Sequence, residues 1–412
     1  MTNSTHTEHN LPAAVPGGPL AGLVVIDMAT MMAGPHTAMM LADFGATVIK
    51  VESPAGDTSR ASPNKVNGTS VYWRLLGRNK FAVTINLKHP KGRDLMLRLI
   101  EKADVLIENM RPGKLEALGL APATLHERNR GLVILRVTGW GQTGPYANRP
   151  TFGTQAEAMS GFTYANGQPG GPPTLPPQTI ADGAAGYLGA FSCMAALWRR
   201  AQDPLHRGQV IDLSLFEALF CMFGPSITAY DQLGIVPERR GSRAPVSAPR
   251  NIYQCRDGKW VAISCAADQI AKRFFALIGR PDLNEDARFS SGDARARHVE
   301  ELDVIIAAWM SKHDAADVVT LLTDGGATAA PVYTIPDILA DPQFISRDLI
   351  AQAPSEDVGP IRMQNAFPKF SESAGGVSWS GRPLGADNHL WFVEMLGLDP
   401  EQLAALHAEG AI

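Results

Sequence analysis

The first 140 residues alternate short apolar runs with helical segments, and this alternation restricts the chain to few folds. Residues 23–28 have the pattern of a buried strand, a helix through 35–44 follows, and 46–52 returns as a second strand. Further strands are expected at 81–87, 104–109 and 132–137. Strands that alternate with helices form parallel sheets, because each crossover helix returns the chain to the end of the sheet at which the preceding strand began. The sequence therefore predicts an α/β fold with a doubly wound, mainly parallel sheet.

The later part of the chain predicts a second, smaller domain. A breaker-rich stretch at 239–245 resembles a linker, Trp260–Ser264 has the pattern of a strand, and helical periodicity appears at 270–278, 302–310 and 318–322. We expect a disordered tail at 1–19, a large domain at 20–225, a small α/β domain at 226–330, and a return linker with the C-terminal part of the large domain at 331–412.

Composition places the chain among ordinary globular proteins. Of its 412 residues 45% are apolar and 19% are charged, and the formal net charge is −4, which argues against a nucleic-acid surface. The four cysteines show no CxxC spacing and do not pair with histidines at metal-ligand intervals, so we expect no metal site. The N-terminus lacks a basic flank and an apolar core, and the apolar segment after residue 182 is too short to span a bilayer. A cytoplasmic protein without membrane contact is predicted.

Three common motifs are missing. The turn after the first strand reads Ala33-Gly34-Pro35 and carries no GxGxxG, and neither a GxxxxGK[ST] loop nor a GxSxG elbow occurs. The nicotinamide dehydrogenase, NTPase and serine hydrolase interpretations therefore lose their main support.

Asp182 stands where a loop becomes a buried helix. A glycine- and proline-rich run at 166–173 precedes it, and a nearly unbroken apolar segment at 187–198 follows. On position alone two interpretations stay open. An N-cap aspartate accepts a hydrogen bond from a backbone N–H of the first turn. A nucleophilic carboxylate is held ionised by the same helix terminus, and Gly183 and Gly186 let a bulky ligand approach the backbone.

Seven segments between roughly residues 20 and 219 have a recognisable order and spacing. The segments are 41–52, Gly56-Asp57 with Arg60, Arg78-Asn79-Lys80, 103–113, 138–146, Asp182-Gly183 and 208–214. Each segment alone is a weak signal, but together they resemble the family III CoA-transferases, which include formyl-CoA transferase, carnitine CoA-transferase and the related α-methylacyl-CoA racemases.

The resemblance implies a Rossmann-like large domain that binds no dinucleotide, and two chains interlocked as a homodimer. Asp182 matches the catalytic aspartate, which in similar enzymes attacks an acyl-CoA to form a mixed anhydride and then an aspartyl-CoA thioester. CoA and its thioesters would be substrates, with no tightly bound cofactor. The expected partners are an acyl-CoA and a free carboxylic acid.

The same resemblance implies a set of CoA contacts. The matching residues are Met31, Met32, Ala33, Arg78, Lys80, Asn109, Met110, Arg111, Trp140 and Gly141. Plainer interpretations remain: core packing for the methionine pair, a solvated surface for the two cations at 78 and 80, and an ordinary strand end at 109–110. Ser53 stands where some relatives carry an arginine near the adenosine phosphates, so that contact is lost or supplied elsewhere.

Three further residues are candidates for holding the substrate acids: Gln142, Tyr146 and Glu157. Glu157 either orients the acceptor or is merely solvated, and the 166–173 run is either a mobile cover over the acyl group or a surface loop. Arg111 and Arg149 lie near the site and make a dicarboxylate such as succinate a plausible substrate. The sequence does not name the acids.

Two alternatives compete with acyl transfer. Racemase chemistry needs a base on each face of an α-carbon, and relatives pair the aspartate with an upstream histidine. That position is Phe152 here, and no histidine lies between His126 and His206. The racemase interpretation is therefore disfavoured. The other alternative is a CoA-ester binding protein without turnover.

Overall fold

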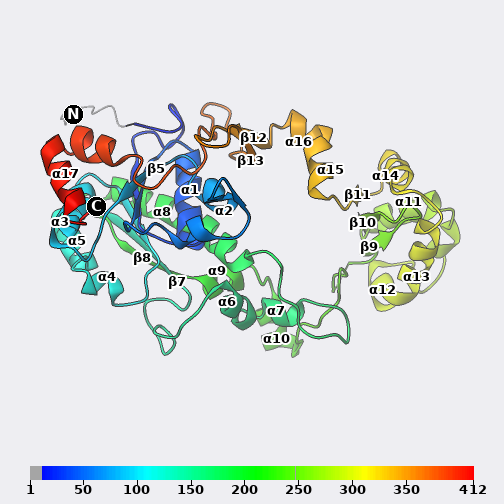
Figure 1. Cartoon of the computed structure of the whole chain (residues 1–412). Helices are drawn as coiled ribbons and strands as arrows, with labels where there is room; N and C mark the ends of the chain where they lie inside the picture. Colours follow the sequence, from blue (N-terminus) through cyan, green and yellow to red (C-terminus); the bar gives the residue numbers. More distant parts are fainter. Residues whose placement is uncertain (1–11, 246) are drawn as a thin grey trace. The chain divides into compact units, whose positions relative to one another are not determined.

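The computed structural model describes residues 12–245 and 247–412 (Figure 1). They form two compact units. The larger unit comprises the chain up to Phe162 with Leu175–Ile227 and Gln343–Ile412, and the smaller comprises Thr163–Thr174 with Thr228–Pro342. The chain thus leaves the larger unit and returns to it. The domain limits expected from the sequence stay a prediction.

A six-stranded parallel sheet forms the centre of the larger unit. Its strand order is β5-β2-β1-β6-β7-β8. The strands are β1 (Val24–Asp27), β2 (Thr47–Glu52), β5 (Lys80–Thr84), β6 (Val105–Glu108), β7 (Val133–Thr138) and β8 (Val210–Ser214). The chain begins in the middle, winds to one edge and then to the other, which makes β1 and β6 the topological switch point. The predicted doubly wound sheet is confirmed.

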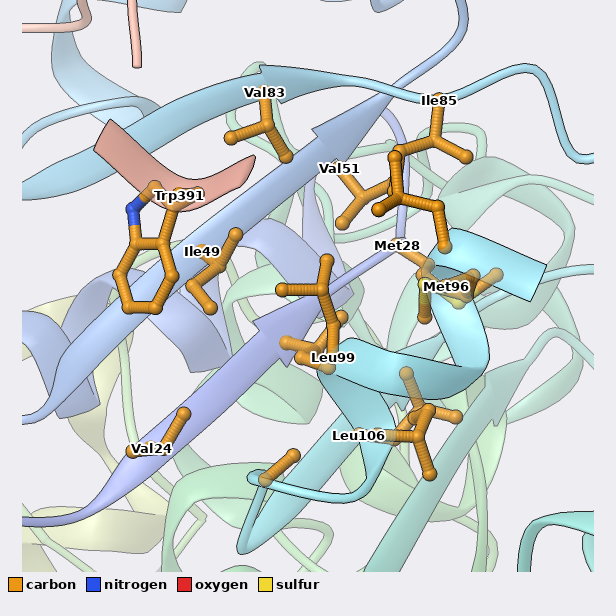
Figure 2. Packing of buried hydrophobic residues seen from close by; sticks show 14 of the residues in the cluster. Val24, Met28, Ile49, Val51, Val83, Ile85, Met96, Leu99, Leu106 and Trp391 are labelled. Atoms are coloured by element: carbon orange, nitrogen blue, oxygen red, sulfur yellow. The ribbon is translucent and has the colours of Figure 1, made fainter. Parts of the chain in front are cut away.

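The two faces of the sheet build separate cores because successive strand side chains point in opposite directions. On β1, Val24 and Ile26 join one core and Val25 joins the other. The first core packs against α3 (Pro90–Ile100), α5 (Pro122–Arg128) and the π-helical segment His389–Met395. Figure 2 shows Trp391 of that segment among strand residues such as Ile49 and Val83.

The second core lies under α1 (Ala33–Asp43) and α8 (Ile180–Gln202). These helices approach closely at two glycines: a Cβ on Gly186 would lie 2.5 Å from Nδ1 of His36, and one on Gly189 would lie 2.5 Å from Oγ1 of Thr37. The 23 residues of α8 are long and apolar enough to cross a membrane, so the expectation that it is too short was wrong. The helix packs against α1 and β7, so its apolar residues on that side belong to the second core.

The smaller unit has its own core. An antiparallel sheet of order β11-β10-β9 contacts helices through a cluster that includes Phe274, Phe275 and Leu302. Its elements are α7 (Phe162–Ala165), α10 (Ser226–Leu233), β9 (Arg250–Gln254), β10 (Trp260–Ser264), α11 (Asp268–Leu277), η2 (Pro281–Asn284), α12 (Gly292–Arg297), α13 (Val299–Met310), α14 (Ala315–Asp324), β11 (Ala329–Pro331) and α15 (Ile335–Ala340). The strand and the three helical segments expected here are present.

The remaining short elements decorate the larger unit or lead into it. They are η1 (Thr58–Ala61), β3 (Lys65–Val66), β4 (Thr69–Ser70), α2 (Val71–Leu76), α4 (Lys114–Ala117), α6 (Gly153–Met159), α9 (Leu215–Phe220), α16 (Pro342–Ser346), β12 (Ile350–Ala353), β13 (Ile361–Gln364) and α17 (Pro400–Ala408).

Part of the stretch expected as a disordered N-terminal tail is described by the structure. Residues 1–11 lie outside the described residues, but 12–19 are placed against the larger unit. Ala14 is 3% exposed, its carbonyl accepts a hydrogen bond from Ser378, and the carbonyl of Pro12 accepts one from Thr47 at 3.0 Å. Proline and glycine made this stretch look disordered, whereas backbone carbonyl contacts, which the sequence does not reveal, hold it in place.

Candidate active site

Asp182 is the third residue of α8 and lies inside its first turn. The N-cap of the helix is Thr179, so the interpretation of Asp182 as an N-cap was wrong. Its side chain lies against the first residue of α6: a Cβ built on Gly153 would stand 2.4 Å from Oδ2 of Asp182. Gly153 therefore makes room for the carboxylate, and any larger residue there would displace it.

The surroundings of Asp182 raise its pKa to about 6. Burial is the largest cause, and the negative charge of Glu157 adds to it. Hydrogen bonds with its own backbone N–H and with the backbone of Ala33, at the start of α1, act in the opposite direction. The carboxylate is thus mostly ionised at neutral pH but more basic than an exposed aspartate, which suits a nucleophile.

Glu157 faces the same region from α6, one turn after Gly153. It is 4% exposed, and its Oε1 accepts a hydrogen bond of 3.4 Å from the backbone N–H of Ala181. The alternative that Glu157 is merely solvated was therefore wrong. Because residues four apart share one helix face, α6 presents both Gly153 and Glu157 toward the start of α8.

Tyr72 on α2 is a neighbour that the sequence analysis missed. Its hydroxyl donates a hydrogen bond of 2.5 Å to the sulfur of Met32. Burial, and after it the charges of Asp182 and Asp57, raise the pKa of Tyr72 to about 12, so the phenol is neutral and able to donate. Nothing in the sequence marks it, because a tyrosine 110 positions away gives no local signal.

The methionine pair lies in the loop between β1 and α1. Met31 is 42% exposed with φ +66°, so core packing was the wrong interpretation for that residue. Its sulfur accepts a hydrogen bond of 3.1 Å from Thr58. Asn109, just after β6, bonds the backbone of Thr30 in this loop through both its oxygen and its nitrogen. The structure thus brings Met31, Met32, Ala33 and Asn109 together with Asp182 at the switch point.

Arg78 and Lys80 are both buried and pair with internal carboxylates. They are 3% and 2% exposed, so a solvated surface was wrong for both. Arg78 pairs with Asp43 at 2.5 Å, and Lys80 donates to Asp27 at 2.8 Å and to the carbonyl of Pro35 at 2.7 Å. Their charges are neutralised inside the fold, and contact with CoA phosphates stays a prediction for them.

A cavity of about 330 Å³ lies at the carboxyl edge of the sheet, beyond β1, β2, β5 and β6. It is lined by Met28, Thr30, Val51, Glu52, Ser53, Gly56, Asp57, Ile85, Asn86, Leu87, Lys88, Met110 and Leu118. Lys88 is the one cation in this lining, while Glu52 pairs with Arg60 at 2.6 Å and Asp57 with Lys50 at 3.0 Å.

Met110 is the predicted residue that this cavity contains, whereas the exposed Arg111 beside it is not part of the lining. Lys88 was missed by the sequence analysis. The signal was available: it follows the predicted strand 81–87 directly, and the carboxyl ends of parallel strands are where ligands bind.

The loop after β7 carries the remaining candidates. Gly141 has φ +85°, and the backbone N–H of Gln142 donates to both carboxylate oxygens of Asp212 at 2.9 Å. Among the residues described, Nε1 of Trp140 and Nε2 of Gln142 are buried without a hydrogen-bond partner. Buried donors of this kind usually find a partner, so they are available to a bound acid.

Two more side chains of this loop stack on one another. The Arg149 guanidinium lies 3.7 Å from the centre of the Tyr146 ring, which in turn lies 6.2 Å from Trp140. The loop ends at Phe152, which is 71% exposed and directly precedes α6. The 166–173 run belongs to the smaller unit, and its place relative to Asp182 is not determined.

Comparison with known proteins identifies the family. The family model for CoA-transferase family III matches residues 20–388. A succinyl-CoA–D-citramalate CoA-transferase from Chloroflexus aurantiacus is 39% identical over 399 residues, covering 96% of this chain and 99% of that protein. A succinate–glutarate CoA-transferase from Agrobacterium fabrum is 32% identical, covering 86% and 93%.

A solved structure is similar as well. The crystal structure of a CAIB/BAIF family protein from Brucella suis has a TM-score of 0.82 and 30% identity, covering 92% of this chain and all of that one. The chain belongs to the family III CoA-transferases.

Proposed function

We propose that this CoA-transferase moves CoA from a dicarboxylic acyl-CoA such as succinyl-CoA to a second carboxylic acid through covalent intermediates on Asp182. The observation that carries the proposal is the setting of Asp182: a carboxylate with a pKa of about 6, in the first turn of α8, against Gly153 and the start of α1.

The reaction follows from the chemistry of a buried carboxylate. Asp182 attacks the thioester carbonyl, the C–S bond breaks, and CoA thiolate leaves behind a mixed anhydride. The thiolate attacks the Asp182 carbonyl, which releases the donor acid and forms aspartyl-CoA. The acceptor carboxylate attacks this thioester and expels the thiolate, which then attacks the acceptor's acyl carbon and frees Asp182. Each step exchanges one carboxylate or thiolate for another, so no water is consumed and the thioester bond is kept.

We place the nucleotide part of CoA in the cavity at the carboxyl edge, where Lys88 provides a cation and Met110 an apolar wall. The thioester end then extends along the loop that carries Met31, Met32 and Ala33. Trp140, Gly141, Gln142 and Tyr146 would contact the acyl group or the acids. Arg78 and Lys80 act indirectly in this arrangement, because internal carboxylates neutralise them.

The preference for a dicarboxylate rests on charge and on relatives. Both relatives described above carry dicarboxylates in their names, and Arg149 stands exposed over Tyr146 with no carboxylate partner among the described residues. A guanidinium held over an aromatic ring can bind a distal carboxylate through two parallel hydrogen bonds. Arg111 is an exposed second candidate.

We further propose a homodimer located in the cytoplasm. The interface between the two copies would include one face of α8. The exposed apolar residues on this face are Tyr187, Phe191, Met194 and Trp198, which are 37–71% exposed. These residues recur at intervals of three and four, so they share one helix face.

Trapping the covalent intermediate tests the mechanism. The protein is mixed with succinyl-CoA and hydroxylamine, and the peptide that contains Asp182 is examined by mass spectrometry for a hydroxamate. Asp182→Asn keeps the size of the side chain but cannot form an anhydride, so we expect no label and a loss of transfer of at least about 1,000-fold. A wild-type protein that transfers CoA but leaves Asp182 unlabelled with every thioester would rule the covalent route out.

A further inference from the structure

The loop between β1 and α1 adopts a conformation that its own sequence disfavours. Met31 has φ +66°, in the left-handed region that side chains other than glycine rarely occupy. Two residues later comes Ala33, the first residue of α1, which packs against the helix of Asp182; the backbone of Ala33 lowers the pKa of that carboxyl. Since Met31 would relax if it were free, something outside the loop must hold it.

The side chain of Asn109 holds this loop by two hydrogen bonds to its backbone. Its Oδ1 accepts a hydrogen bond of 2.9 Å from the N–H of Thr30, and its Nδ2 donates one of 2.7 Å to the carbonyl of Thr30. A single amide thereby satisfies both backbone groups of the residue before Met31. Two buried lysines bind the backbone on either side of this segment. Lys50 donates a hydrogen bond to the carbonyl of Ala29, and Lys80 donates one to the carbonyl of Pro35.

We propose that Asn109 is a positioning residue for the nucleophile: by clamping Thr30 it fixes Met31 in the left-handed conformation and so aims the backbone of Ala33 at Asp182. The inference rests on the proposed role of Asp182. It differs from a direct CoA contact, because the amide of Asn109 is already engaged with the protein on both its donor and its acceptor side.

A cycle of variants tests the clamp. Asn109→Ala removes it, Met31→Gly removes the penalty for the left-handed conformation, and the double variant combines the two. Asn129→Ala is the matched control, since Asn129 clamps backbone in the same way, donating to the carbonyls of Ile100 and Ala103 at 2.9 and 2.6 Å. It follows α5 at the opposite end of the sheet, where β7 begins.

The measurements are kcat, the KM for the thioester that labels wild-type Asp182, and the pH profile of kcat/KM. We expect Asn109→Ala to lower kcat about 10- to 100-fold, because a nucleophile out of line by about 1 Å loses that much. The acid limb of the profile should move to higher pH, since a lost hydrogen bond no longer favours the ionised carboxylate. The other titratable groups around the site, Glu157 on α6, Tyr72 on α2 and His36 on α1, are unchanged in all variants.

In the double variant Met31→Gly should restore part of the lost kcat, and Asn129→Ala should leave kcat and the acid limb as in the wild type. An Asn109→Ala variant with normal kcat and raised KM would overturn the inference in favour of a CoA contact. So would a loss that Met31→Gly does not reduce, or an equal loss in Asn129→Ala. If the wild type labels at Asp182 and Asn109→Ala matches it throughout, only the clamp is refuted; an unlabelled wild type refutes the proposed mechanism itself.

Discussion

Asp182 is surrounded by groups that move its pKa in opposite directions. Burial and Glu157 raise it, while backbone hydrogen bonds lower it, and the balance is a value of about 6. The ionised form of this carboxylate is present at neutral pH but is destabilised by its surroundings. Removal of its negative charge therefore lowers the free energy of the site. Formation of the anhydride or the aspartyl thioester does remove it, so Glu157 would favour each covalent step.

Glu157→Gln tests this role by removing the charge and keeping the shape. Loss of the negative neighbour lowers the pKa of Asp182, so Asp182 stays ionised to lower pH and the acid limb of kcat/KM moves down. Above that limb the less basic nucleophile should react more slowly, by up to about 10-fold. Glu127→Gln, an exposed carboxylate on α5, is the control and should leave the profile unchanged. An unshifted acid limb in Glu157→Gln would show that its charge does not act on Asp182.

At the scale of elements, the residues that we propose for CoA binding lie at or after the ends of the strands. The sequence predicted these strands because buried parallel strands are short apolar runs bounded by turn signals, as at 104–109. It also placed Asp182 at a loop-to-helix junction. It could not show that Lys80 turns inward to Asp27, because the direction of a lysine on a buried strand depends on its partners across the sheet. Lys88, by contrast, was open to prediction from its place after β5.

Lys88→Met tests the cavity as the nucleotide site. A lost charge-assisted contact with phosphate should raise the KM for the acyl-CoA by about 10-fold, equivalent to roughly 1.4 kcal/mol, and leave kcat nearly unchanged. Lys91→Met is the control and should leave this KM unchanged, because Lys91 forms a surface ion pair with Glu409 at 2.7 Å and does not line the cavity.

A dephospho-CoA thioester identifies which phosphate Lys88 contacts. If it is the 3′-phosphate, wild type and Lys88→Met should handle the dephospho thioester alike. A KM that is unaffected by Lys88→Met with both thioesters would remove CoA phosphates from this cavity.

At the scale of the whole molecule, the larger unit contains segments from the first and the last part of the sequence. Most of the smaller unit comes from the residues between them. Periodicity predicted both units, since each has its own apolar pattern, but it could not separate core from interface. The apolar run after Asp182 looked uniformly buried, whereas α8 buries Ala185, Cys193 and Ala196 in the core and exposes the Tyr187–Trp198 stripe. An exposed apolar stripe on a long helix indicates a surface that another partner covers.

A second copy of the chain is the partner that we expect, and Trp198→Glu tests it. Trp198 is 71% exposed, so a charge there should not disturb the fold of the single chain, but it would be buried unpaired in a dimer. Sedimentation should give the wild type twice the mass of the chain and shift Trp198→Glu toward the monomer. Val304→Glu on α13, where Val304 is 69% exposed outside the stripe, should keep the wild-type mass. A wild type that sediments as a monomer contradicts the dimer, and a dimeric Trp198→Glu places the interface elsewhere than the stripe.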